Sequence, residues 1–146
     1  MDIPNEAMIL VADGEKALFL RNKGDAEFPN FVVEGKEVLD NPPSGEQGSD
    51  RPGRAMGDPS NRSAMEETDW HQLEKDRFVA EIANMLLQQA TKKKFDRLVV
   101  AAPPHTLGEL RKHLHKSVSD RIIGEVDKDL THLPVYEIEA HLKKET

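Results

Sequence analysis

The sequence predicts an α/β fold in which a mixed five-stranded sheet is flanked by helices. Two patterns lead to this prediction: short apolar runs typical of strands fill residues 7–39, and helical periodicity alternates with apolar runs after residue 69. A polar segment rich in proline and glycine separates these two parts. Consecutive strands followed by helix–strand alternation indicate a mixed sheet with helices packed against it.

The first part is interpreted as a β-meander. Residues 7–12 form a continuous apolar run that predicts a buried strand, and residues 16–21 predict a second strand that runs back after Asp13-Gly14. Such a dipeptide tolerates the positive φ that tight hairpins often require. Residues 31–39 predict a third strand, and Gly35 within it suggests a bulge.

Residues 40–69 are the most unusual segment. They contain four prolines, four glycines and only four apolar side chains, those of Ala55, Met56, Ala64 and Met65. This composition buries too little apolar surface to offset an ordering entropy of roughly 1–2 kcal/mol per residue. Loops of this length are usually functional or disordered. We therefore predict a mobile loop over residues 40–69 inside one domain that spans residues 1–146.

A long helix is predicted after this segment. Asp69 and Gln72 have the spacing of a capping box, and an apolar stripe of helical period continues to Ala90. The cations of Lys92–Lys94 suit the negative end of the helix dipole, where the helix is expected to end. We expect Trp70, near the predicted start, to cover the core.

Two strands and two helices complete the pattern. Residues 98–102 predict a strand buried on both faces, and Thr106 with Glu109 suggests a second capping box that opens a helix. Residues 121–126 predict the fifth strand, and Pro134 suits the first position of a final helix. The resulting order, β-β-β-α-β-α-β-α, is that of a ribonuclease-H-like architecture.

Composition excludes several classes of protein. The absence of cysteine excludes disulfides, thiolate metal sites and cysteine nucleophiles, and it suits a reducing compartment. The longest apolar run, residues 7–12, is too short to span a bilayer, and the first residues are acidic where a secretory signal would be basic. We therefore expect a cytoplasmic protein without a membrane partner. A net charge of −7 argues against an extended basic surface for bare nucleic acid.

Four ordered blocks resemble the bacterial host attachment family, whose members are described as proteins required for attachment to host cells. The similarity covers nearly the whole chain, and that family in turn resembles the central domain of archaeal and eukaryotic class-one peptide release factors, which has the same order of elements. The blocks are residues 48–54 with 62–66, 74–78, 95–111 and 125–134.

The resemblance implies a role in translation. In release factors of this class, a Gly-Gly-Gln tripeptide on an exposed loop near the first long helix enters the peptidyl-transferase centre. This chain has Gly45-Glu46-Gln47-Gly48 in the comparable loop and no Gly-Gly-Gln. We therefore expect an accessory module without catalytic activity, which contacts the ribosome, ribosomal RNA or tRNA through residues 40–69, with Gln47 as one candidate contact.

Three arginines in this loop are the main candidates for phosphate binding. Arg51 and Arg54 flank a Pro-Gly turn and Arg62 follows, and guanidinium groups recognise phosphate through paired hydrogen bonds. The alternative is a solvated linker in which these arginines pair with neighbouring acids, of which residues 40–69 contain seven. A protein that supports host attachment indirectly, through interactions inside the cell, is a second functional interpretation.

A magnesium-dependent nuclease is the third interpretation. Asp13 follows the first strand, and Asp127 and Asp129 follow the fifth, where nucleases of this architecture gather carboxylates around magnesium. Each of these acids also has a local explanation in a turn or cap. Because the histidines lack the spacing of a metal motif and no phosphate-binding loop or nucleophile elbow occurs, we expect no bound metal or cofactor.

Overall fold

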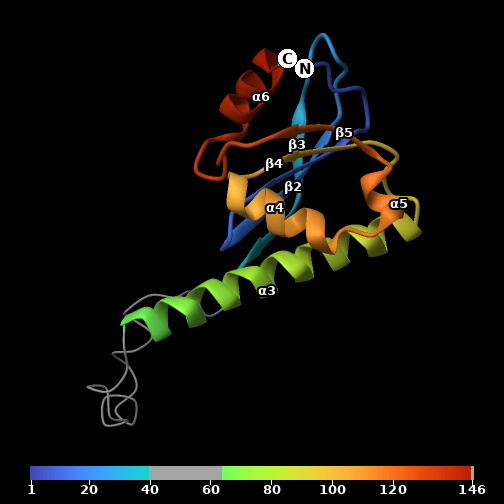
Figure 1. Ribbon diagram of the computed structural model, residues 1–146. Helices are drawn as coiled ribbons and strands as arrows, with labels where there is room; N and C mark the ends of the chain where they lie inside the picture. The colour runs from blue at the N-terminus through green and yellow to red at the C-terminus, as the bar shows by residue number, and fades with distance from the viewer. Residues whose placement is uncertain (40–63, 146) are drawn as a thin grey trace.

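The computed structural model describes residues 1–39 and 64–145 and confirms the predicted mixed sheet. Its five strands have the order β3-β2-β1-β4-β5 (Figure 1). The pairs β1–β2 and β2–β3 are antiparallel, whereas β1–β4 and β4–β5 are parallel. The strands are β1 (Met8–Ala12), β2 (Lys16–Asn22), β3 (Phe31–Val38), β4 (Leu98–Ala101) and β5 (Ile122–Val126).

Helices cover both faces of this sheet. Three of them, α3, α4 and α5, lie on one face and α6 lies on the other (Figure 1). Successive residues of β1 point to opposite faces, so that Met8 and Leu10 enter the core between the sheet and α3, while Ile9 and Val11 enter the core between the sheet and α6. The helices are α3 (Ala64–Thr91), α4 (Pro104–His113), α5 (Lys116–Ser119) and α6 (Val135–Lys144).

The turn between β1 and β2 is held by an aspartate side chain. Asp13 Oδ1 accepts hydrogen bonds from the backbone N–H groups of Glu15 at 2.7 Å and Lys16 at 2.8 Å. No described glycine has a positive φ, so the expected use of Gly14 for that purpose is wrong. The predicted bulge in β3 is confirmed: Phe19 pairs with Gly35 and Leu20 with Val33, which leaves Glu34 as the extra residue.

The long helix α3 begins earlier than the sequence predicts. It starts at Ala64, so the last residues of the predicted loop 40–69 are helical, and Asp69 lies inside the helix. Alanine, methionine and glutamate, which open this helix, have high intrinsic helix propensity, and this outweighed the capping signal at Asp69. Gln72, the other half of the predicted capping box, uses its amide to bind Asp76 Oδ1 at 3.0 Å.

Prolines set the starts of the two later helices. Pro103 caps α4 without a side-chain hydrogen bond and Pro104 follows at the first helical position, so the predicted capping box at Thr106 is wrong. Proline needs no backbone partner there and already has a helical φ. Thr106 is instead buried inside the first turns. Pro134 is the residue that caps α6 rather than its first helical residue.

A Schellman motif ends α3. Lys93 has a φ of 57°, and the N–H groups of Lys93 and Lys94 bond to the carbonyl oxygens of Ala90 and Gln89, both at 2.9 Å. The lysine run therefore follows the helix, as expected, but its middle residue adopts a left-handed conformation that usually belongs to glycine.

Candidate functional site

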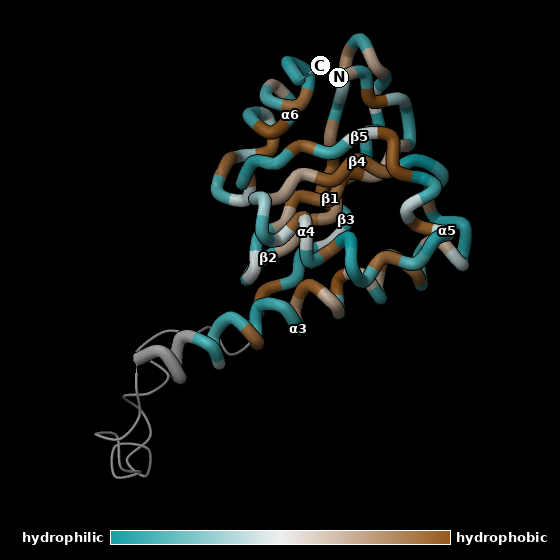
Figure 2. The backbone as a smooth tube through the Cα atoms, viewed as in Figure 1, coloured by the Kyte–Doolittle hydropathy of each residue, from teal (hydrophilic) through white to brown (hydrophobic). Residues whose placement is uncertain are grey.

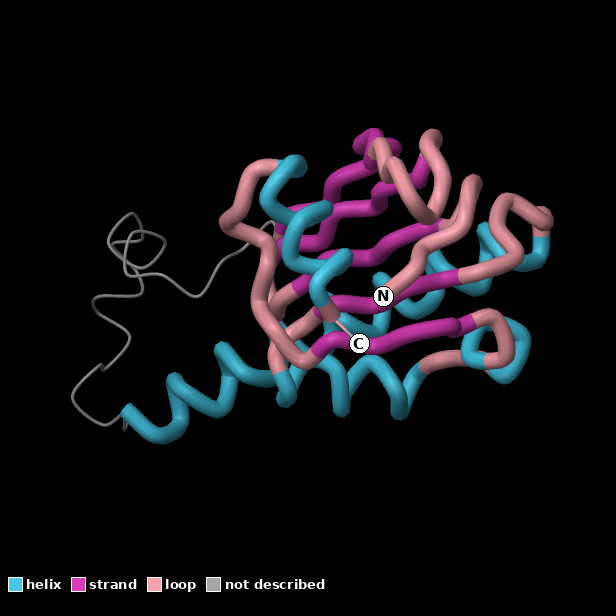
Figure 3. Tube along the Cα trace, turned by 90° about the horizontal axis from the view of Figure 1, so that it is seen from above, coloured by secondary structure: helices cyan, strands magenta, loops and turns pink. Residues whose placement is uncertain are grey.

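The N-terminal part of α3 projects from the body of the structure. Among the α3 residues whose burial is described, 69–91, the first in the core is Phe78, and the segment Ala64–Arg77 that precedes it is here called the arm. At 1.5 Å per residue the arm is roughly 20 Å long. Figures 1 and 3 show it running past the edge of the sheet. The described residues of the arm are mostly hydrophilic, whereas the part of α3 that packs against the sheet also carries hydrophobic residues (Figure 2).

Two large apolar side chains on the arm are exposed. Trp70 is 50% exposed and Leu73 is 48% exposed, and neither belongs to the core. The expectation that Trp70 covers the core is therefore wrong, because α3 extends beyond the sheet at this point. The Trp70 ring instead contacts the adjacent His71 ring edge-on, with centroids 5.7 Å apart.

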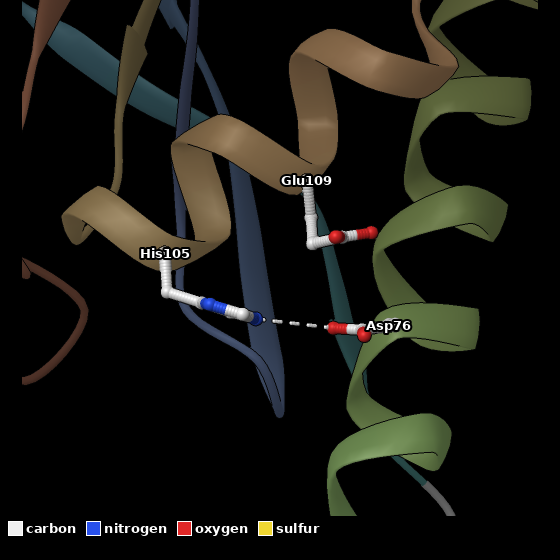
Figure 4. Close-up of side chains that lie close together, drawn as sticks. All are labelled: Asp76, His105 and Glu109. Carbon is white, nitrogen blue, oxygen red and sulfur yellow. Dashed lines mark hydrogen bonds and ion pairs between the residues drawn. The ribbon is translucent and has the colours of Figure 1, made fainter.

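Polar residues gather where the base of the arm meets α4. Asp76 from α3 and His105 and Glu109 from α4 each direct one potential ligand atom into the same space, and these three atoms lie within 4.8 Å of one another (Figure 4). His105 Nε2 is 3.4 Å from Asp76 Oδ1 and 3.0 Å from Gln72 Nε2. Lys75, on the same helix, also pairs with Glu15 in the β1–β2 turn at 3.6 Å. The arm is thus anchored at its base by polar contacts.

Two basic groups on α4 surround Glu109. Its Oε1 accepts a hydrogen bond from Lys112 Nζ at 2.8 Å, and its Oε2 lies 3.7 Å from His113 Nε2. The hydrogen bond and the charge of Glu109 raise the pKa of Lys112 above its ordinary value, and Asp76 adds a smaller effect in the same direction. Both oxygens of the Glu109 carboxylate therefore have a basic neighbour on α4.

Sequence reasoning missed this cluster, although two of its three residues had a signal. His105 and Glu109 are four residues apart, which places them on one face of a helix. Asp76 lies 29 residues before His105, and only the packing of α3 against α4 brings the two together.

The acids predicted as nuclease candidates lie at the ends of β1 and β5. The Thr131 hydroxyl is 3.0 Å from Asp13 Oδ2 and 2.6 Å from Asp129 Oδ1, so one threonine bridges these two acids. A hydroxyl has a single proton and donates it to one acceptor at a time. Asp127 lies close enough to Arg111 and Lys128 to contribute to their raised pKa values. Within residues 1–39 and 69–145, the one group of three potential ligands is the junction cluster, without these aspartates.

The predicted RNA-contacting residues lie outside the described residues. Gln47, Arg51, Arg54 and Arg62 all belong to the connection between β3 and α3, which spans residues 40–63. The described ends of that connection are Leu39, directly after β3, and Ala64, at the tip of the arm.

Comparisons with known proteins match a family model and several solved structures. A family model described as bacterial archaeo-eukaryotic release factor family 12 matches residues 6–142. The crystal structure of an archaeal translation termination factor aligns with a TM-score of 0.49 and 11% sequence identity, over 94% of this chain and 41% of that one. The chain therefore spans about two fifths of that factor. No curated protein sequence matches. Within the described residues, no helix is long and apolar enough to cross a membrane.

Proposed function

Because the chain belongs to bacterial archaeo-eukaryotic release factor family 12, we propose that this release-factor-like protein contacts the ribosome, ribosomal RNA or tRNA through residues 40–69. The family match over residues 6–142 is the observation that carries the proposal. That range contains every described strand and the connection between β3 and α3.

The arm supports this choice of contact segment. Residues 40–63 join the body of the structure to Ala64, the residue at the free end of the arm. A helix is stiff over roughly 20 Å, and it can present whatever is attached to its tip to a large partner without contact between the partner and the sheet. Arg51, Arg54 and Arg62 supply charge-assisted hydrogen bonds to phosphates in this proposal, and Gln47 supplies an amide.

A ribosome co-sedimentation assay tests the proposal. Untagged protein is spun with purified ribosomes at low salt, and a second sample is treated with ribonuclease first. We expect the protein in the ribosomal pellet, and we expect the ribonuclease treatment and added salt to release it, because phosphate contacts weaken steeply with ionic strength. Protein that stays in the supernatant with ribosomes at low salt, and that does not shift the mobility of tRNA in a native gel, would refute the proposal.

Exposed apolar residues on the arm favour one alternative, a cytoplasmic interaction protein that supports host attachment indirectly. Trp70 and Leu73 offer a protein partner an aromatic and an aliphatic contact. Under this alternative, partners recovered from a cell lysate are unaffected by ribonuclease, and substituting Trp70 and Leu73 with alanine releases them. Under the ribosomal proposal, the same ribonuclease treatment removes the partners.

A further inference from the structure

We propose that Asp76, His105 and Glu109 bind a zinc ion at the junction of α3 and α4. This inference is independent of the ribosomal proposal, because it depends only on described side chains. The ligand atoms come from two helices and converge within 4.8 Å (Figure 4). No cysteine is present anywhere in the chain, so zinc must be bound by nitrogen and oxygen ligands.

The spacing of the cluster fits tetrahedral coordination. Zinc bonds to nitrogen and oxygen at about 2.0–2.1 Å, which places tetrahedral ligand atoms about 3.3–3.4 Å apart. His105 Nε2 and Asp76 Oδ1 are separated by 3.4 Å. The ligand atom of Glu109 lies within 4.8 Å of these two, so binding requires side-chain rotations that bring all three atoms to this spacing.

The neighbours of the cluster suit a metal site. Lys112 binds one oxygen of Glu109 and thereby orients the carboxylate, as outer-shell partners of metal ligands do. Gln72 Nε2 lies 3.0 Å from both Asp76 Oδ1 and His105 Nε2, the two atoms that would bind zinc, so its amide has to move away when the ion binds. Three protein ligands leave a fourth position for water.

The donor set selects zinc over the common hard cations. One imidazole and two carboxylates suit a first-row transition metal, whereas magnesium and calcium prefer oxygen ligands alone. His105 and Glu109, on one face of α4, provide two ligands from a single helix. Asp76 lies two residues before Phe78, where α3 enters the core. An ion at this position links the base of the arm to α4 and fixes the direction of the arm.

Zinc titration of the untagged chain tests the inference. Isothermal titration calorimetry measures zinc binding to wild type, Asp76→Asn, His105→Ala and His132→Ala. His132 is an exposed histidine in the loop before α6 and serves as the matched control. Cobalt is titrated in parallel, because its visible absorption reports tetrahedral coordination. Circular dichroism establishes that each variant is folded.

We expect one zinc per chain, an intense tetrahedral cobalt spectrum, and a rise in Tm with zinc that a chelator reverses. Loss of the His105 imidazole or of the Asp76 charge should weaken binding at least tenfold, because even outer-shell substitutions at metal sites cost 10- to 100-fold. His132→Ala should bind as wild type does. The proposal is overturned if wild type binds no zinc, or if Asp76→Asn and His105→Ala both keep the zinc affinity of wild type. It is also overturned if His132→Ala lowers the zinc affinity as much as those two variants do.

Discussion

At the scale of single residues, Leu86 tests the packing of α3 most sharply. It is fully buried on the face of the helix that meets the sheet. Leu86→Ala should lower the free energy of unfolding by about 2–5 kcal/mol, because the substitution removes buried methyl groups and leaves a cavity. Urea denaturation of wild type and variant measures this difference.

Leu73→Ala is the matched control, since the same substitution on the same helix affects a side chain that is 48% exposed. Its effect should remain within about 0.5 kcal/mol. If the two variants lower the free energy of unfolding equally, the buried face of α3 is assigned wrongly.

Residue-level burial on α3 was predictable only where the helix lies below the sheet. Val79, Ile82 and Leu86 are buried as the helical stripe predicts. The apolar character of Trp70 gave the wrong prediction, because periodicity reports which side of a helix is apolar and not where its partner surface ends. Two of the three residues of the junction cluster were accessible to sequence reasoning, through the spacing of His105 and Glu109. Asp76 was not, since its place depends on how two helices pack.

At the scale of elements, the end of α3 offers a test of backbone strain. Lys93 adopts a φ of 57°, a conformation that costs a residue with a Cβ atom roughly 1–2 kcal/mol. Glycine removes that strain but gives the unfolded chain more freedom. We expect Lys93→Gly to stabilise the protein by about 0.5–1 kcal/mol, measured as a higher denaturant midpoint with an unchanged slope.

The same substitution at Lys92 provides the control. Lys92 does not have a positive φ, so Lys92→Gly relieves no backbone strain. It should leave the denaturant midpoint unchanged or lower it. A lower midpoint for Lys93→Gly would mean that the left-handed conformation at this position carries no strain.

Elements were predicted better than their boundaries. All five strands and the three long helices follow from apolar runs and periodicity, which report burial over many residues. Helix starts depend on a few local groups: a proline begins α4 where a side-chain cap at Thr106 was expected, and Pro134 caps α6 where it was expected one position later. The short helix α5 was missed, because Lys116–Ser119 is one turn long and has a single buried side chain, Val118.

At the scale of the whole molecule, the sheet follows from the order of its elements. Three antiparallel strands joined by short turns, followed by two parallel strands after helices, give the observed order β3-β2-β1-β4-β5. The arm did not follow from the sequence, because its projection requires α3 to be longer than the sheet it covers. This arm is what connects the fold to the proposed function.

The proposed function depends on the binding of RNA phosphates by arginines between β3 and α3. Arg51 and Arg54 are replaced together by alanine, and the control replaces the exposed Lys36 and Arg97 with alanine, so both variants lose the same charge. Lys36 lies on β3, and Arg97 lies beyond the C-terminal end of α3.

Ribosome co-sedimentation over a series of salt concentrations, with Tm measured on the same samples, gives the decisive comparison. We expect weaker binding for the Arg51/Arg54 variant, a salt slope lower by about one unit per lost phosphate contact, and a nearly unchanged Tm. The control should bind as wild type does. Equal binding by both variants, or a large fall in Tm for the arginine variant without loss of a salt-dependent partner, would refute phosphate binding by these arginines.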